Sequence, residues 1–176
     1  MELSNKITQA IRDVHDFPKE GIVFKDITPI MLNAGLSNEI LQSLTEQFRS
    51  DNLQGIAGIE SRGFLFGFPL AMALGIPFIM IRKKGKLPYE KISHAYDLEY
   101  GSAVIEMHSD ALSPGDRILI HDDLLATGGS AAAAAELIQK CQGVVAGFNF
   151  MVELPFLAGR EKLKTYSDNI SNLVQY

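Results

Sequence analysis

Short apolar runs alternate along the chain with longer segments in which apolar residues recur at helical spacing. Continuous apolar runs are typical of strands buried on both faces, and the helical spacing is typical of helices that cover them. The runs predict strands at residues 55–59, 77–81, 103–107, 117–121 and 143–152. The helical spacing predicts helices over residues 5–14, from an N-cap at Ser37 to Phe48, from the first strand to about Leu74, and over residues 130–141.

This alternation predicts an α/β fold with a mainly parallel central sheet that is flanked by helices. Ligands of such sheets bind beyond the carboxyl ends of the strands, so we expect the chemistry after Ile59, Ile81, His121 and Val152. Residues 87–100 are polar and show no clean period, which predicts a long loop.

Composition and charge exclude several classes of protein. The 176 residues, 47% hydrophobic and 21% charged, are typical of one globular domain. A net charge of −5 disfavours a general nucleic-acid-binding role, so no nucleic-acid partner is expected. The single cysteine, Cys141, excludes an intramolecular disulfide and a cysteine-based metal cluster.

Residues 64–81 form an uncharged run that is long enough to be considered as a membrane span. Gly67, Pro69, Gly75 and Pro77 interrupt it, so we interpret it as a buried helix, a tight turn and a buried strand. The first residues lack a basic region followed by an apolar run, and no signal peptide is expected. We therefore expect a cytoplasmic protein with no membrane partner.

Residues 118–130 carry the strongest functional signal. An apolar strand leads to two adjacent acids, Asp122 and Asp123, and a loop with a threonine and two glycines then opens a helix at Ser130. The glycines let backbone N–H groups approach an anion, and the helix N-terminus adds partial positive charge. Because the carboxylates can accept hydrogen bonds from a diol beside that anion, the segment predicts a ribose 5-phosphate site. The acids taken alone are also typical of a turn.

At this point the sequence resembles the type I phosphoribosyltransferases and, within that family, the adenine-specific members. The resembling segments are residues 17–18 with 21–29, 60–67, 82–88, 98–101, 122–130, 152–154 and 159–163. Three positions depart from the family pattern. His121 replaces a usually apolar residue, Ser130 replaces a common threonine, and Lys25 replaces a frequent arginine.

The resemblance implies one phosphoribosyltransferase domain over residues 1–176, in which residues 1–35 contribute a hood that covers the base. It implies transfer of the 5-phosphoribosyl group from phosphoribosyl pyrophosphate (PRPP) to N9 of adenine, with AMP and pyrophosphate as products, in purine salvage. It also implies a homodimer and Mg²⁺ that is bound mainly through the pyrophosphate and ribose hydroxyls of PRPP, without metal ligands from the protein.

The resemblance further assigns residues to roles. The ribose-phosphate group would be bound by Asp122, Asp123, Ala126, Thr127, Gly128, Gly129 and Ser130. Pyrophosphate would be bound by Arg62, Arg82, Lys83, Lys86 and Tyr100, most of which belong to the dense basic run at residues 82–86. Adenine would be bound by Val23, Phe24, Lys25 and Leu154. The expected catalytic residues are Arg62, Lys83 and Glu99, the last through proton transfer on the purine.

Other interpretations remain open at the level of the sequence. Another purine or pyrimidine phosphoribosyltransferase would share the acids and the glycine loop. A PRPP-sensing regulator without catalysis would share the fold, although it should carry a DNA-binding module or a basic face. A nucleotide-binding oxidoreductase is disfavoured because no dinucleotide glycine fingerprint is present. Phe24 and Leu154 are equally typical of a core, and Glu99 is nearly as typical of an exposed loop.

Overall fold

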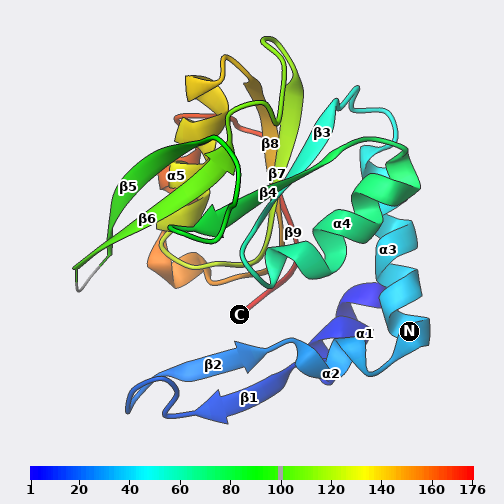
Figure 1. Cartoon of the computed structure of the whole chain (residues 1–176). Coiled ribbons are helices and arrows are strands. Elements are labelled where there is room, and N and C mark those ends of the chain that lie inside the picture. Colours follow the sequence, from blue (N-terminus) through cyan, green and yellow to red (C-terminus); the bar gives the residue numbers. More distant parts are fainter. Residues whose placement is uncertain (99–100) are drawn as a thin grey trace. The chain divides into compact units, whose positions relative to one another are not determined.

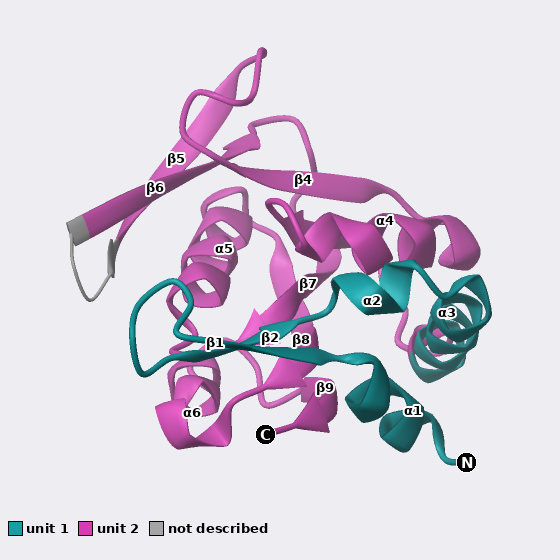
Figure 2. Ribbon diagram, turned by 90° about the horizontal axis from the view of Figure 1, so that it is seen from below, with its two compact units in different colours: residues 1–47 teal, residues 48–176 magenta. Residues whose placement is uncertain are grey.

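A computed structural model of the chain describes residues 1–98 and 101–176 (Figure 1). These residues separate into two compact units, residues 1–47 and residues 48–176, which are coloured separately in Figure 2. The first unit contains a two-stranded ribbon and three helices, and the second contains a seven-stranded sheet with its helices.

In the first unit, helix α1 is shorter than the sequence predicts. The elements of this unit are α1 (Leu3–Ala10), β1 (Arg12–His15), β2 (Val23–Asp26), α2 (Thr28–Met31) and α3 (Ala34–Phe48), whose last residue falls in the second unit. The prediction of one helix through Val14 is wrong, because the backbone becomes extended at Ile11. Val14 instead pairs with Phe24 in the antiparallel ribbon of β1 and β2. Pairing with β2 has therefore outweighed the helical period of the local sequence.

Helix α3 begins earlier than predicted because a different residue caps it. The Asn33 side chain accepts a hydrogen bond from the backbone N–H of Leu36 at 3.1 Å, which satisfies one of the free donors in the first turn. Ser37 lies inside the helix, and its hydroxyl donates to the Ile30 carbonyl at 2.9 Å. Ser37 is therefore not the N-cap.

The second unit is built on a sheet with strand order β5-β6-β4-β3-β7-β8-β9. Its strands are β3 (Gly55–Ile59), β4 (Phe78–Lys83), β5 (Lys91–Leu98), β6 (Gly101–His108), β7 (Arg117–Leu125), β8 (Val144–Glu153) and β9 (Ile170–Gln175). Its helices are α4 (Gly63–Leu74), α5 (Gly129–Lys140), the 3₁₀ turn η1 (Pro155–Leu157) and α6 (Gly159–Leu163). Five strands run parallel and the pairs β4–β6 and β6–β5 are antiparallel, which confirms the predicted fold class.

Helices α4 and α5 cover opposite faces of this sheet, as Figures 1 and 2 both show. Toward α5 the sheet presents large apolar side chains, among them Ile81, Ile120 and Phe148, which form one buried cluster with the alanines of residues 131–135. Alanine side chains are small, so α5 can lie close to the strands and bury this face completely.

Toward α4, one aromatic ring of the sheet lies over two glycines. The Phe78 ring lies over Gly58 of β3 and Gly67 of α4, and a Cβ on Gly58 would lie only 2.5 Å from its Cζ. Phe64 and Phe68 of α4 each meet this ring edge-on, with centroids 5.7 Å away. The glycines therefore let one aromatic residue fill the space between strand and helix.

The apolar run at residues 64–81 has the structure predicted for it. It contains α4, a left-handed turn at Gly75 with φ of 69°, and most of β4. Among the described residues, no helix has the length and apolar character needed to cross a membrane.

The sequence predicts a long loop over residues 87–100, but residues 91–98 of this segment form the strand β5. Strand β5 pairs with β6 in an antiparallel ladder. Ile92, His94 and Tyr96 are half-buried while Ser93 and Ala95 are exposed, so a period of two is present. The histidine and tyrosine make that alternation look polar throughout. Strand β7 also continues past His121 to Leu125, and β9 and α6 lie outside the elements that the sequence predicted.

Candidate active site

A cavity of about 600 Å³ lies in the second unit, where the carboxyl ends of β3, β4 and β7 meet. Its wall is formed by Ile59, Glu60, Ser61, Arg62, Ile81, Lys83, Tyr96, Ala103, Ile105, Asp122, Asp123, Leu124 and Ser130. The two acids of β7 and the serine that follows them therefore share one cavity with an arginine and a lysine from two neighbouring strand ends. This is the edge of the sheet at which the sequence places the chemistry.

Asp122 and Asp123 are the last polar side chains of β7, and they have different surroundings. Asp123 is 6% exposed and forms an ion pair with the Arg62 guanidinium. Burial and the negative charge of Asp123 raise the pKa of Asp122 well above its ordinary value. Asp122 therefore loses its proton less readily than an isolated aspartate.

Arg62 reaches Asp123 because helix α4 begins directly against the end of β7. A Cβ on Gly63 would lie 2.7 Å from the His121 carbonyl oxygen and 3.0 Å from Oδ1 of Asp122. Only glycine permits this approach, since real Cβ atoms do not come so near to backbone oxygens. The preceding residue, Arg62, is thereby held at the mouth of the cavity with its side chain 44% exposed.

The basic turn at residues 82–86 is held by two carboxylates. Glu60 accepts hydrogen bonds from Nη2 and Nε of Arg82 at 3.2 and 3.3 Å and from the Lys83 backbone at 2.9 Å. Glu106, 3% exposed, accepts one from the Gly85 backbone at 2.9 Å. Burial alone would raise the pKa of Glu60, but these bonds and the nearby positive charges outweigh it and lower the pKa.

The members of the basic turn therefore take different positions. Lys83 lines the cavity. The Arg82 guanidinium points instead to Glu60 and donates to the Lys86 carbonyl at 3.1 Å. Of the predicted pyrophosphate-binding residues that the structure describes, Arg62 and Lys83 are the ones whose side chains form the cavity wall.

The loop from β7 to α5 contains a left-handed glycine directly before the helix. Gly128 adopts a left-handed conformation with φ of 75°, and Gly129 opens the helix. Ser130 lies in the cavity wall, and its hydroxyl is 3.1 Å from the hydroxyl of Tyr96 on β5. Tyr96 is absent from the sequence prediction, and the period of two in residues 91–98 is the signal that could have revealed it.

A neutral histidine lies beneath the two acids. His121 is fully buried, and this burial lowers its pKa to about 4 although Asn149 and Asp123 act in the opposite direction. The Asn149 amide nitrogen donates to Ser171 at 3.0 Å, which leaves its oxygen to accept from Nδ1 of His121 at 2.9 Å. The ring therefore packs inside the sheet, and the cavity receives no charge from it.

The predicted adenine-binding residues come from separate places. Val23, Phe24 and Lys25 lie on β2 in the first unit, where Lys25 Nζ pairs with Asp13 at 2.7 Å. Leu154 follows β8 in the second unit, and its backbone N–H donates to the Leu125 carbonyl at 2.9 Å. Glu99 and Tyr100 lie outside the described residues.

Comparison with known proteins identifies the family. A family model described as the phosphoribosyl transferase domain matches residues 25–155. The adenine phosphoribosyltransferase of Cytophaga hutchinsonii is 51% identical over 174 residues, which are 99% of this chain and 96% of that protein. The chain belongs to the adenine phosphoribosyltransferases. A further member, from Halothermothrix orenii, is 51% identical over 161 residues, 92% of this chain and 95% of that protein.

Solved structures of adenine phosphoribosyltransferases agree with the fold over the whole chain. The enzyme of Thermoanaerobacter pseudethanolicus matches with a TM-score of 0.94 and 45% identity, covering 98% of this chain and 99% of that one. The enzyme of Saccharomyces cerevisiae matches with a TM-score of 0.90 and 41% identity, covering 97% and 98%. The latter was solved in complex with adenine and an imino-altritol bisphosphate.

Proposed function

We propose that the chain transfers the 5-phosphoribosyl group of PRPP to N9 of adenine, giving AMP and pyrophosphate in purine salvage. One observation supports this most directly. The cavity is lined by the two acids of β7 and by Ser130 of α5 together with Arg62 and Lys83. The acids and the serine suit a ribose phosphate, and the basic side chains suit a pyrophosphate, which are the two halves of PRPP.

The chemistry requires both the basic and the acidic side chains of the cavity. As the C1–O bond to pyrophosphate breaks, the electron pair leaves with pyrophosphate and C1 becomes cationic. N9 of adenine then forms the C1–N9 bond, and the purine loses a proton. Arg62 and Lys83 stabilise the anionic leaving group, and the carboxylates of Asp122 and Asp123 accept hydrogen bonds from the ribose hydroxyls beside the developing cation. Glu99 is proposed to handle the purine proton.

Binding of PRPP involves an exchange of partners at Asp123. In the structure its carboxylate is occupied by Arg62, whose side chain is 44% exposed and therefore able to move. The ribose hydroxyls replace the guanidinium on Asp123, and Arg62 turns to the pyrophosphate. The 5-phosphate is bound by residues 126–129 and the Ser130 hydroxyl.

The adenine site is proposed to use backbone groups of β2. Val23 and Lys25 are two residues apart on a strand, so their N–H and C=O groups point to the same edge of the ribbon. The Lys25 side chain is only 13% exposed and is paired with Asp13, which supports recognition through the backbone. Residues 1–35 would form the hood, with Phe24 and Leu154 against the purine ring.

Mg²⁺ is proposed to bind mainly through PRPP. No group of three or more His, Cys, Asp or Glu side chains in residues 1–98 and 101–176 converges as a metal site. Mg²⁺ commonly keeps waters and substrate phosphates as ligands, and the pyrophosphate and ribose hydroxyls of PRPP would supply oxygen ligands of this kind. When bound, the ion neutralises charge on the pyrophosphate.

A homodimer and a cytoplasmic location complete the proposal. Leu65, Phe68 and Met72 lie on one side of α4 and are 43%, 52% and 67% exposed, which makes this side a candidate for contact with a second copy. The elution volume and light scattering of the wild type and of Phe68→Glu would test the dimer. Cell fractionation with an antibody would test the location.

The activity is tested with purified protein, Mg²⁺, PRPP and, separately, adenine, hypoxanthine, guanine and orotate. AMP from adenine, with little product from the other bases, is the expected result. Absence of AMP would overturn the proposal, and product from another base would make the chain a different phosphoribosyltransferase.

The neighbouring residues Lys83 and Lys84 test which side chains bind the pyrophosphate. Lys83 lines the cavity, whereas Lys84 is the next residue and does not. Lys83→Met should weaken product inhibition by pyrophosphate about tenfold, the change expected when one charged hydrogen bond is lost. Lys84→Met is the matched control and should leave it nearly unchanged. Equal effects from the two variants would place the pyrophosphate elsewhere.

A further inference from the structure

The turn and short helix that follow β8 touch the proposed phosphate loop through bare backbone. A Cβ on Gly159 would overlap the Ala126 carbonyl oxygen and lie 2.9 Å from the Gly128 nitrogen. A Cβ on Gly128 would in turn lie 2.7 Å from the Gly159 carbonyl oxygen. Two glycines therefore face each other, and the backbone of residues 126–128 rests directly on residue 159.

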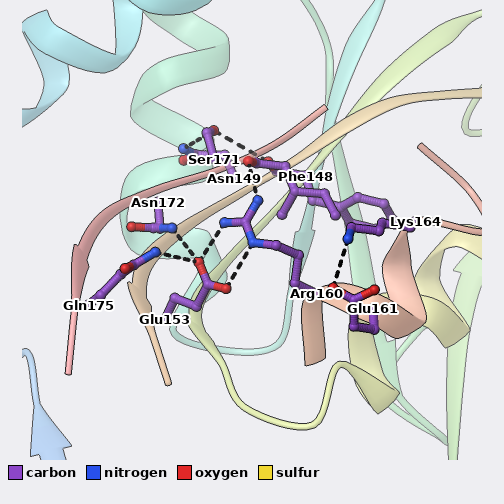
Figure 3. A network of polar contacts seen from close by, with 10 residues as sticks. Phe148, Asn149, Glu153, Arg160, Glu161, Lys164, Ser171, Asn172 and Gln175 are labelled. Carbon is purple, nitrogen blue, oxygen red and sulfur yellow. Dashed lines mark hydrogen bonds and ion pairs between the residues drawn. The ribbon is translucent and has the colours of Figure 1, made fainter. Parts of the chain in front are cut away.

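The residue next to Gly159 is held by a buried carboxylate. Glu153, 3% exposed at the end of β8, accepts from Nε of Arg160 at 3.0 Å and from Nη2 at 2.5 Å, as Figure 3 shows. Nη1 of Arg160 donates to the Ile170 carbonyl on β9 at 2.8 Å. Bidentate contacts of this kind fix orientation as well as distance. The start of α6 is thereby tied to both β8 and β9.

Two side-chain amides of β9 complete the set of hydrogen-bond donors around the Glu153 carboxylate. The side-chain nitrogens of Asn172 and Gln175 both donate to its Oε2, the second at 3.2 Å (Figure 3). The Arg160 hydrogen bonds, opposed by burial and assisted by these amides, lower the pKa of Glu153. The carboxylate is therefore charged at neutral pH and has partners for both oxygens.

The same carboxylate also borders the other end of the phosphate loop. Glu153 is paired with Leu125 in the parallel register of β7 and β8. The loop starts at the residue after Leu125 and rests on Gly159 one to three residues later. The ion pair between Glu153 and Arg160 thus links two places that support the loop. One is the pairing of Glu153 with Leu125 before the loop, and the other is Gly159, next to Arg160, on which the loop rests.

Arg160 acts through the loop and not on the substrate. Nε, Nη1 and Nη2 each donate to a protein acceptor, and none of them lines the cavity. A site for an anionic group needs its donors held within about 0.5 Å of the productive geometry, which requires a rigid support.

We propose that Gly159, Arg160 and Glu153 are positioning residues that set the loop at residues 126–128 for the 5-phosphate of PRPP. The proposal rests on the function proposed above, because it takes that loop to be the phosphate site. It predicts that disturbing the support raises the KM for PRPP far more than the KM for adenine. A purely structural role would instead lower the fraction of folded enzyme and leave both KM values unchanged.

Gly159→Ala is the sharpest variant, because it adds one methyl group at the contact. We expect the KM for PRPP to rise about 10- to 100-fold, the range associated with displacement of a binding group by up to about 1 Å. The KM for adenine should stay within about twofold, a change too small to reflect loss of a single hydrogen bond. Gly147→Ala, on β8 and away from the loop, is the matched control, since a Cβ there would lie 2.6 Å from the backbone oxygen of Asn169, which precedes β9. It should destabilise the fold without changing the KM for PRPP.

Arg160→Lys and Glu153→Gln keep the proposal testable if Gly159→Ala does not fold. Lysine cannot reproduce the two parallel hydrogen bonds of arginine, so the KM for PRPP should rise while the KM for adenine remains constant. Wild-type enzyme that makes no AMP would overturn the proposed function before any variant is measured. Wild-type enzyme that makes AMP, with variants whose KM for PRPP equals the wild-type value, would overturn the positioning role alone.

Discussion

The Phe78 ring between β4 and α4 allows a quantitative test of how this core is assembled. Gly58→Ala introduces a methyl carbon 2.5 and 2.7 Å from two carbons of the ring. Favourable carbon contacts lie at about 3.5–4.0 Å, so the overlap is about 1 Å. The ring has little room to retreat, because Phe64 and Phe68 each meet it at 5.7 Å between centroids.

Overpacking of this kind costs about 1–3 kcal/mol of unfolding free energy, a large part of the roughly 5–15 kcal/mol that stabilises a domain. Phe78→Leu removes the ring atoms that the methyl group meets and should itself cost about 1–3 kcal/mol. In the double variant Gly58→Ala/Phe78→Leu the methyl group occupies the vacated space. The combined loss should therefore be smaller than the sum of the single losses by about 1 kcal/mol or more.

Urea unfolding of the wild type, both single variants and the double variant, followed by circular dichroism, measures this coupling. Gly147→Ala with Phe78→Leu serves as the control pair. Gly147 is on β8, three places away from β4 in the sheet, and its Cβ would meet Asn169. That control pair should be additive. Additivity within about 0.5 kcal/mol for the Gly58 pair as well would refute the contact on which the reasoning rests.

Three further predictions concern charge and capping. Because the pKa of Asp122 is raised, its contribution to stability is present below its ordinary pKa and is lost as pH rises through the raised value. Asp122→Asn should therefore raise the Tm at pH 7 while slowing AMP formation, and a lowered Tm would contradict this. The pKa of His121 is lowered to about 4, so up to about 3 kcal/mol of stability should be lost as pH falls from about 6.5 to 4. His121→Val should flatten that decline in urea unfolding, and equal slopes would count against it. Asn33→Ala should cost about 1 kcal/mol through loss of the α3 cap, measured in the same way, whereas a change near zero would mean that the bond to Leu36 adds no stability.

The central strands β3, β4, β7 and β8 could be predicted from the sequence because each contains a run of mostly apolar residues. All five residues of β3 are buried, and its observed bounds agree with the prediction. The acids Asp122 and Asp123 could be found for the same reason, since they directly follow such a run. The α/β fold and the edge at which the cavity lies are consequences of these patterns.

The elements that could not be predicted depend on contacts with distant residues. Strand β1 has a local period that suits a helix and becomes a strand by pairing with β2. Strand β5 alternates, but with His94 and Tyr96 on its half-buried side. The hydrogen-bond partners of the side chains around the site could not be predicted from the sequence either. Nothing in the sequence around Glu153 indicates that Arg160, Asn172 and Gln175 surround its carboxylate.

The hydrogen bond between Tyr96 and Ser130 makes the fluorescence of Tyr96 a probe of the site. The chain contains 5 tyrosines and no tryptophan, so tyrosine emission is not masked by energy transfer to an indole. The Tyr96 hydroxyl is 3.1 Å from the very serine proposed to bind the 5-phosphate. If the 5-phosphate binds Ser130 as proposed, its arrival should change the partner of that phenol and hence its fluorescence. Binding of PRPP to the wild-type enzyme should then be measurable without a label.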